Sequence, residues 1–146
     1  MDIVRYFVSP NYADNKPNEA LHGASLDSIQ EVPFEKKAGR VEVTEFTLLV
    51  RMGTATALAL LDANGLRSAV YAELKAVAKK YSYPERPYKL IALGSIYGSP
   101  EQGTLAPCIG GNVQSGDQER VVPGVSFVPA EQIWPEGTRF AVVSAW

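Results

Sequence analysis

A basic and aromatic segment over residues 79–89 carries the side chains best suited to binding a partner. Four cations and three tyrosines fall within these eleven residues. Basic groups interleaved with aromatic rings can neutralise phosphates and stack on bases, and tyrosines can anchor a protein interface. The structural alternative is that the lysines only complement the negative end of a helix dipole. We expect a partner-binding surface composed of Lys79, Lys80, Tyr81, Tyr83, Arg86 and Tyr88.

A second candidate site pairs Cys108 with His22, which are the only cysteine and the only histidine of the chain. The thiol stands in the sequence Ala-Pro-Cys-Ile-Gly-Gly, whose flexible backbone N–H groups could form an oxyanion pocket. Nothing in the spacing brings the thiol and the imidazole together. Free cysteine is also among the most buried residue types. A cysteine-dependent enzyme is therefore an alternative hypothesis, and the one we prefer is a non-catalytic interaction protein.

Metal and cofactor sites are not expected, and the one alternative left open is a Mg²⁺ or Ca²⁺ site made of carboxylates alone. One histidine and one cysteine cannot supply the nitrogen and sulfur ligands of a zinc site within one chain. The residues at 62–65, Asp-Ala-Asn-Gly, resemble the start of a calcium loop, but the later ligand positions are wrong. The glycine-rich run at 110–116 lacks the lysine of a phosphate-binding loop.

Composition and charge limit the class of protein. The 146 residues are 46% hydrophobic and 21% charged, which is typical of one globular domain. A formal net charge of −2 gives no general attraction to nucleic acid or to an anionic membrane. No apolar run reaches the length of a membrane span, and the first residues, MDIVRYFVSP, do not resemble a signal peptide. We expect a location in the cytoplasm or in a virion, with no membrane partner.

The helix that would hold the basic segment is predicted over residues 66–81. Apolar residues recur there at steps of four, four, three and four, which marks one helix face. This pattern leaves Arg67, Glu73 and the lysines on the solvent side. Residues 54–63 could form a preceding helix capped by Thr54, or a strand between two turns. Their alanines and leucines favour the helix.

The remaining segments predict strands and long connections. Residues 40–51 form the best strand, and its apolar second half suggests a central place in a sheet. Further strands are expected over 3–8, 88–97 with a bend at Gly94, 120–128 and 139–146. Residues 9–25 are predicted to be an extended arm and 98–118 a long glycine-rich loop. The fold class is therefore α+β, a single domain over residues 1–146 with a mostly antiparallel sheet of about five or six strands against one main helix.

The function hypothesis follows from the weakness of the catalytic motifs and from the number of segments suited to contacts. We expect a non-catalytic assembly or interaction protein that acts through extended loops and binds a protein partner or itself. A structural component of a virus or phage and a small protein inhibitor both fit this description. The alternatives are an enzyme that uses Cys108 with His22, and a protein that contacts nucleic acid through residues 79–89.

Overall fold

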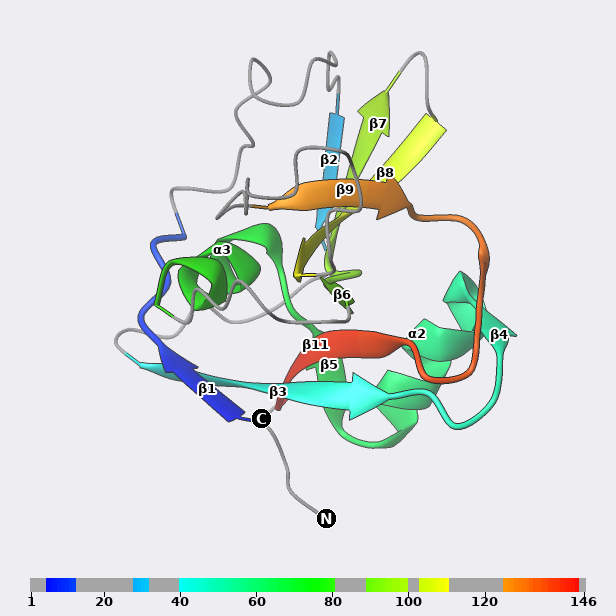
Figure 1. The fold of residues 1–146 in the computed structure, drawn as a ribbon, viewed down its shortest axis with the longest axis horizontal. Coiled ribbons are helices and arrows are strands. Elements are labelled where there is room, and N and C mark those ends of the chain that lie inside the picture. The colour runs from blue at the N-terminus through cyan, green and yellow to red at the C-terminus, as the bar shows by residue number, and fades with distance from the viewer. Residues whose placement is uncertain are drawn as a thin grey trace, which may run out of the picture.

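The computed structural model describes residues 5–12, 28–31, 40–80, 89–99, 103–110 and 125–144, and a large twisted sheet organises them (Figure 1). The elements in chain order are β1 (Arg5–Val8), β2 (Ser28–Glu31), β3 (Val41–Thr47), β4 (Met52–Gly53), α2 (Thr54–Ala63), β5 (Leu66–Ser68), α3 (Tyr71–Lys80), β6 (Lys89–Ile91), β7 (Ser95–Ser99), β8 (Gly103–Gly110), β9 (Ser126–Pro129), β10 (Ile133–Trp134) and β11 (Arg139–Ser144).

Nine of these strands form one mixed sheet. Its order is β1-β3-β11-β6-β8-β7-β2, with β5 also paired to β11 and β9 also paired to β8. β6 and β11 run parallel, and the other pairs in this sheet are antiparallel. β4 and β10 make a separate two-stranded sheet. The fold is therefore sheet-rich with two described helices, and the predicted count of five or six strands was too low.

Both faces of the central strand β11 are covered, because its successive side chains alternate between two buried clusters. Ala141 and Val143 pack in the cluster that contains the α3 residues Leu74 and Val77. Phe140 and Val142 pack in the cluster that contains the α2 residues Ala57 and Leu61. The two helices, each of ten residues, therefore cover opposite faces of β11, so the predicted main helix covers one face and the shorter helix that the sequence allows over 54–63 covers the other.

The predicted helix over 66–81 begins late, because its first residues pair as β5 with β11. Leu66 lies opposite Ser144 and Ser68 lies opposite Val142. α3 then begins at Tyr71, whose backbone N–H donates to the buried Ser95 hydroxyl at 2.8 Å. The predicted apolar face is otherwise correct over Val70, Leu74 and Val77, which are fully buried. Tyr81 lies outside the described residues.

The second helix prediction is confirmed, since α2 spans Thr54–Ala63 and is capped at its C-terminus by Asn64. Thr54 is its first helical residue rather than its cap, which is Gly53. The buried Thr54 hydroxyl donates to the carbonyl of Ala130 and accepts the indole N–H of Trp134 at 2.9 Å. These bonds tie the start of α2 to Ala130, which follows β9, and to Trp134 of β10.

The predicted loop over 98–118 is wrong where residues 103–110 form β8, a strand that pairs with β6, β7 and β9. Five consecutive residues of β8, from 105 to 109, are buried. Such a short apolar run is typical of a strand buried on both faces. The positive φ angles of Gly103 and Gly110 mark its two ends. Residues 100–102 and 111–118 lie outside the described part of the chain, as do residues 13–25 of the predicted arm.

The bend predicted at Gly94 is confirmed, because β6 ends at Ile91 and β7 begins at Ser95. The chain passes very close to another backbone at this point. A Cβ atom added to Gly94 would lie 2.5 Å from the carbonyl oxygen of Ala69 and 2.7 Å from that of Ser68. Only glycine permits this approach without a shift of the backbone.

Candidate functional site

The most exposed large apolar side chains of the described residues lie on two adjoining segments at one end of the molecule. Leu49 is 82% exposed, Val50 is 61% exposed and Ile133 is 64% exposed. Leu49 and Val50 belong to the short connection from β3 to β4, and Ile133 lies in β10 opposite Gly53 of β4. We call these three residues the apolar tip. β3 ends at Thr47, so the prediction that the second half of the 40–51 segment is a central strand is wrong.

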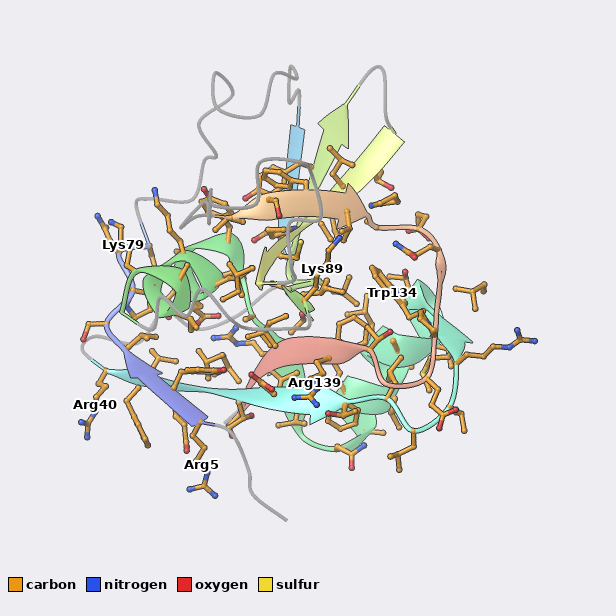
Figure 2. All side chains as sticks on the ribbon, in the orientation of Figure 1. Arg5, Arg40, Lys79, Lys89, Trp134 and Arg139 are labelled. Atoms are coloured by element: carbon orange, nitrogen blue, oxygen red, sulfur yellow. The ribbon has the colours of Figure 1, made fainter. Side chains whose placement is uncertain are left out.

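The apolar tip stands on a well-packed base. Leu48, the residue before the tip, is buried, its N–H donates to Thr138 and its carbonyl accepts from Gly137, both at 2.9 Å. β10 alternates, so that Ile133 faces outward while Trp134 faces inward. The Trp134 ring packs edge-on against Phe140 at 5.5 Å between centroids, and Figure 2 shows it inside the molecule near α2 and β11. The exposed side chains therefore stand next to residues that are buried and hydrogen-bonded or packed in the core.

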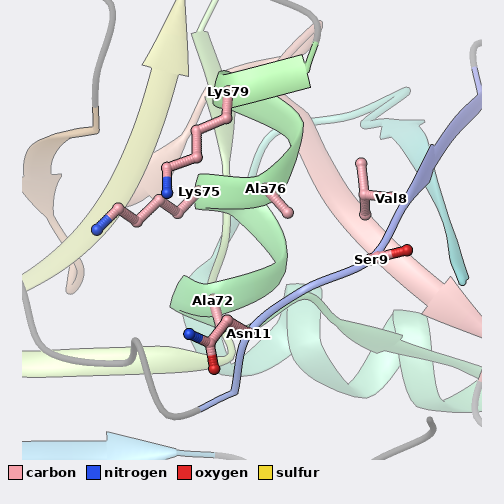
Figure 3. A pocket seen from close by; sticks show the side chains of 7 residues that line it. All are labelled: Val8, Ser9, Asn11, Ala72, Lys75, Ala76 and Lys79. Atoms are coloured by element: carbon pink, nitrogen blue, oxygen red, sulfur yellow. The ribbon is translucent and has the colours of Figure 1, made fainter. Parts of the chain in front are cut away.

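A groove runs along α3 on another part of the surface (Figure 3). Its volume is about 300 Å³. The helix contributes one wall and the chain segment that continues from the end of β1 contributes the other. The groove is lined by Val8, Ser9, Asn11, Ala72, Lys75, Ala76 and Lys79.

A buried ion pair lies beneath the start of α3. Glu73 is 0% exposed, and its two carboxylate oxygens accept hydrogen bonds from Arg67 at 2.8 and 2.7 Å. The carboxylate also accepts the hydroxyl of Tyr12 at 2.8 Å and the backbone N–H of Val70 at 3.0 Å. The last bond is the reciprocal half of a capping box, in which the third helical residue satisfies the N–H just before the helix. The prediction that Glu73 faces solvent is wrong.

The surroundings of Glu73 hold Tyr12 and Arg67 in fixed protonation states. Burial raises the pKa of the Tyr12 hydroxyl, and the hydrogen bond to the Glu73 carboxylate and its charge raise it further. Burial alone would lower the pKa of Arg67, but its hydrogen bonds and charge pairing with Glu73 raise it overall. With four donors on one carboxylate, Glu73 is suited to holding strand, helix and N-terminal segment together rather than to accepting a substrate proton.

A related cluster occurs on β3. The side chain of Glu45 is 3% exposed, pairs with Arg139 at 3.3 Å and accepts the Tyr6 hydroxyl. Glu73 and Glu45 are therefore each bound by one tyrosine and one arginine. A buried carboxylate without such partners would be strongly destabilising.

The predicted partner-binding surface is described only in part. Lys79 lies exposed on α3 and lines the groove. Lys80 is the last residue of α3, while Tyr81, Tyr83, Arg86 and Tyr88 lie outside the described residues. The grouping of these side chains into one surface stays a prediction.

The environment of Cys108 is that of a packed side chain. Cys108 lies in β8, is fully buried and has its sulfur 3.5 Å from the hydroxyl oxygen of Ser126. Burial raises the pKa of the thiol, and the hydrogen bond to Ser126 and the charge of Lys89 oppose this only in part. A raised pKa disfavours the thiolate, which is the reactive nucleophile. His22 lies outside the described residues, so its distance from Cys108 is not defined.

Thiol labelling provides a test of this environment. We expect native Cys108 to react with a thiol reagent such as iodoacetamide on the order of 100-fold more slowly than in the denatured chain, because reaction requires local opening. The readout is the labelled fraction by mass spectrometry over time. Labelling of the native protein at the denatured rate would mean that the thiol is accessible and would restore Cys108 as a candidate nucleophile.

Metal-ligand clusters and membrane-spanning helices are both absent from the residues that the structure describes. There, no three histidine, cysteine, aspartate or glutamate side chains come together as a set of metal ligands. None of the helices in this part of the chain is long and apolar enough to cross a bilayer. In comparisons with known proteins, no family model, no curated protein and no solved structure matches this chain.

Proposed function

We propose that this chain is a non-catalytic assembly protein whose copies associate through the apolar tip. The observation that carries the proposal is the exposure of Leu49, Val50 and Ile133 on adjoining segments. Single exposed apolar residues are normal on any protein, whereas a group of them on neighbouring segments is typical of an interaction site. The burial of Cys108 supports the non-catalytic part of the proposal.

A second copy of the chain is the partner that best suits this surface. Two-fold pairing brings the same patch of each subunit together, and aliphatic groups meet without a conflict of charge. Two exposed charged side chains near the tip in sequence carry opposite signs: Arg51 follows Val50, and Glu131 lies two residues before Ile133. A rim with both signs can pair with its own copy across a two-fold axis.

The size of the tip sets its role in such an interface. Full burial of a leucine or valine side chain contributes about 1.5–3 kcal/mol. Stable interfaces bury roughly 1,200 Å² or more in total, which three side chains per copy cannot supply alone. The tip would therefore be the anchor at the centre of a larger contact, with polar neighbours around it.

Substitution of the tip tests the proposal. We expect Leu49→Asp with Val50→Asp to raise the dissociation constant of self-association about 100-fold or more, because two apolar anchors are lost and charge is added. The matched control is Ala59→Asp with Thr104→Asp, which adds the same charge at exposed positions outside the tip. Sedimentation velocity gives the constants, and thermal melting checks that each variant folds. Equal dissociation constants for the wild type and the tip variant would refute the proposal.

A further inference from the structure

The two-stranded sheet of β4 and β10, which we call the β4–β10 ribbon, carries one exposed charge on each side of its central apolar residue. In its antiparallel register Ile133 lies opposite Gly53. The Ile133 side chain lies against this glycine, because a Cβ atom added to Gly53 would be 3.6 Å from the Cδ1 atom of Ile133. Arg51 stands two residues before Gly53, and Glu131 stands two residues before Ile133; both are exposed.

The two charges lie at opposite ends of the ribbon. Antiparallel strands run in opposite directions, so the residues that precede β4 and those that precede β10 enter the ribbon at different ends. Arg51 and Glu131 are therefore equally far in sequence from the central pair, on opposite sides of it. Within the part of the chain that the structure describes, neither Arg51 nor Glu131 takes part in an ion pair. Their counter-ions have to come from outside these residues.

We propose that two copies join with their β4–β10 ribbons antiparallel, so that Arg51 of each copy forms an ion pair with Glu131 of the other. This inference rests on the proposed self-association and specifies its orientation. A two-fold axis near the Gly53–Ile133 pair exchanges the ends of the ribbon, so it places Ile133 beside its own copy and brings each positive end against a negative end. A parallel arrangement would instead bring like charges together, which is unfavourable.

Glu136 provides an internal comparison for this orientation. It is exposed, like Glu131, and it follows Trp134, which lies opposite Met52. Glu136 therefore lies at the end of the ribbon that carries Arg51. In the antiparallel arrangement this end faces the opposite end of the partner's ribbon, so a charge at position 136 is turned away from the Arg51 side chain of the other copy.

Exchange of the charges tests the orientation on the full chain. We expect Arg51→Glu alone and Glu131→Arg alone each to raise the dissociation constant of self-association about tenfold, because each puts like charges together at both ends of the interface. The double variant Arg51→Glu/Glu131→Arg should return to within about threefold of the wild type, since both ion pairs form again with reversed signs. Sedimentation velocity at low ionic strength, where exposed charges are least screened, measures the constants.

The matched control is the double variant Arg51→Glu/Glu136→Arg, which has the same net charge as the wild type. We expect it to stay about tenfold weaker, because the new arginine lies at the wrong end of the ribbon. Thermal melting checks that each variant folds.

The outcomes separate this inference from the proposed function. Self-association that none of the charge variants changes would overturn the antiparallel pairing and leave the apolar tip as the interface. Equal recovery in the two double variants would indicate an effect of net charge and would also overturn the pairing. A wild type that remains a single chain at every concentration would refute the proposed function and this inference together.

Discussion

Replacement of Arg67 by alanine is expected to lower the free energy of unfolding by about 3–5 kcal/mol, because it leaves a buried carboxylate without its cation. Glu73 is fully buried and receives two of its four hydrogen bonds from Arg67. The loss is a large fraction of the roughly 5–15 kcal/mol by which a folded domain is stable. Urea denaturation of the wild type and the variant, followed by circular dichroism, measures the difference.

Two further variants separate the buried pair from an ordinary surface pair. Arg5→Ala removes the exposed contact between Arg5 and Glu42, at 3.4 Å, and should cost about 1 kcal/mol or less. Arg67→Met with Glu73→Leu removes both charges and should recover much of the stability lost in Arg67→Ala, because no unpaired ion remains. If Arg67→Ala costs no more than Arg5→Ala, the carboxylate of Glu73 is not enclosed as described.

Replacement of Gly94 by alanine should cost about 3 kcal/mol, at the upper end of what overpacking usually costs. The added methyl group would lie 2.5 Å from the carbonyl oxygen of Ala69, and the nearby atoms are backbone, which cannot rotate away. The Gly94 N–H also donates to this carbonyl at 3.0 Å, so a shift would weaken that bond. The change would disturb the junction between β5, α3 and β7.

Gly53→Ala is the matched control for this prediction. A Cβ atom at Gly53 would meet only the Cδ1 atom of Ile133 at 3.6 Å, which is ordinary contact. We expect a loss of about 1 kcal/mol or less there, which includes the weaker capping of α2 by alanine. Similar melting temperatures for the two variants would contradict the close approach at Gly94.

The elements that the sequence predicts correctly are those in which residue propensity and the residues that begin or end an element indicate the same structure. In α2, alanine and leucine favour a helix and Asn64-Gly65 ends it, so propensity and stop signal indicate the same structure. The strand predicted over 139–146 is also confirmed over its described residues as β11, Arg139–Ser144. The bend at Gly94 followed from a glycine inside a strand pattern.

The errors have physical causes that lie outside local sequence. β5 was assigned to the helix because its apolar residue fits a helical repeat, whereas pairing with β11 draws it into the sheet. The sequence predicts a loop at β8 because glycine and proline surround a short apolar run. Glu73 was placed in solvent by its polarity, since its partner Tyr12 is 61 residues away.

The candidate site was mostly not predictable for the same reason. Leu49 and Val50 look like core residues in sequence, and only the end of β3 at Thr47 leaves them exposed. Of the residues that line the groove, only Lys79 belongs to the partner-binding surface predicted from the sequence. The others become neighbours only when the segment after β1 crosses α3. The role of the aromatic residues from 81 to 88 stays a prediction.

The average mass in solution, measured by sedimentation equilibrium over a range of concentrations, tests the proposed assembly most directly. The chain has a mass of 15.8 kDa. The proposal predicts that the average mass of the wild type rises toward at least twice this value between about 1 μM and about 1 mM, while the Leu49→Asp/Val50→Asp variant stays lower at each concentration. A wild-type mass of one chain at every concentration would contradict it.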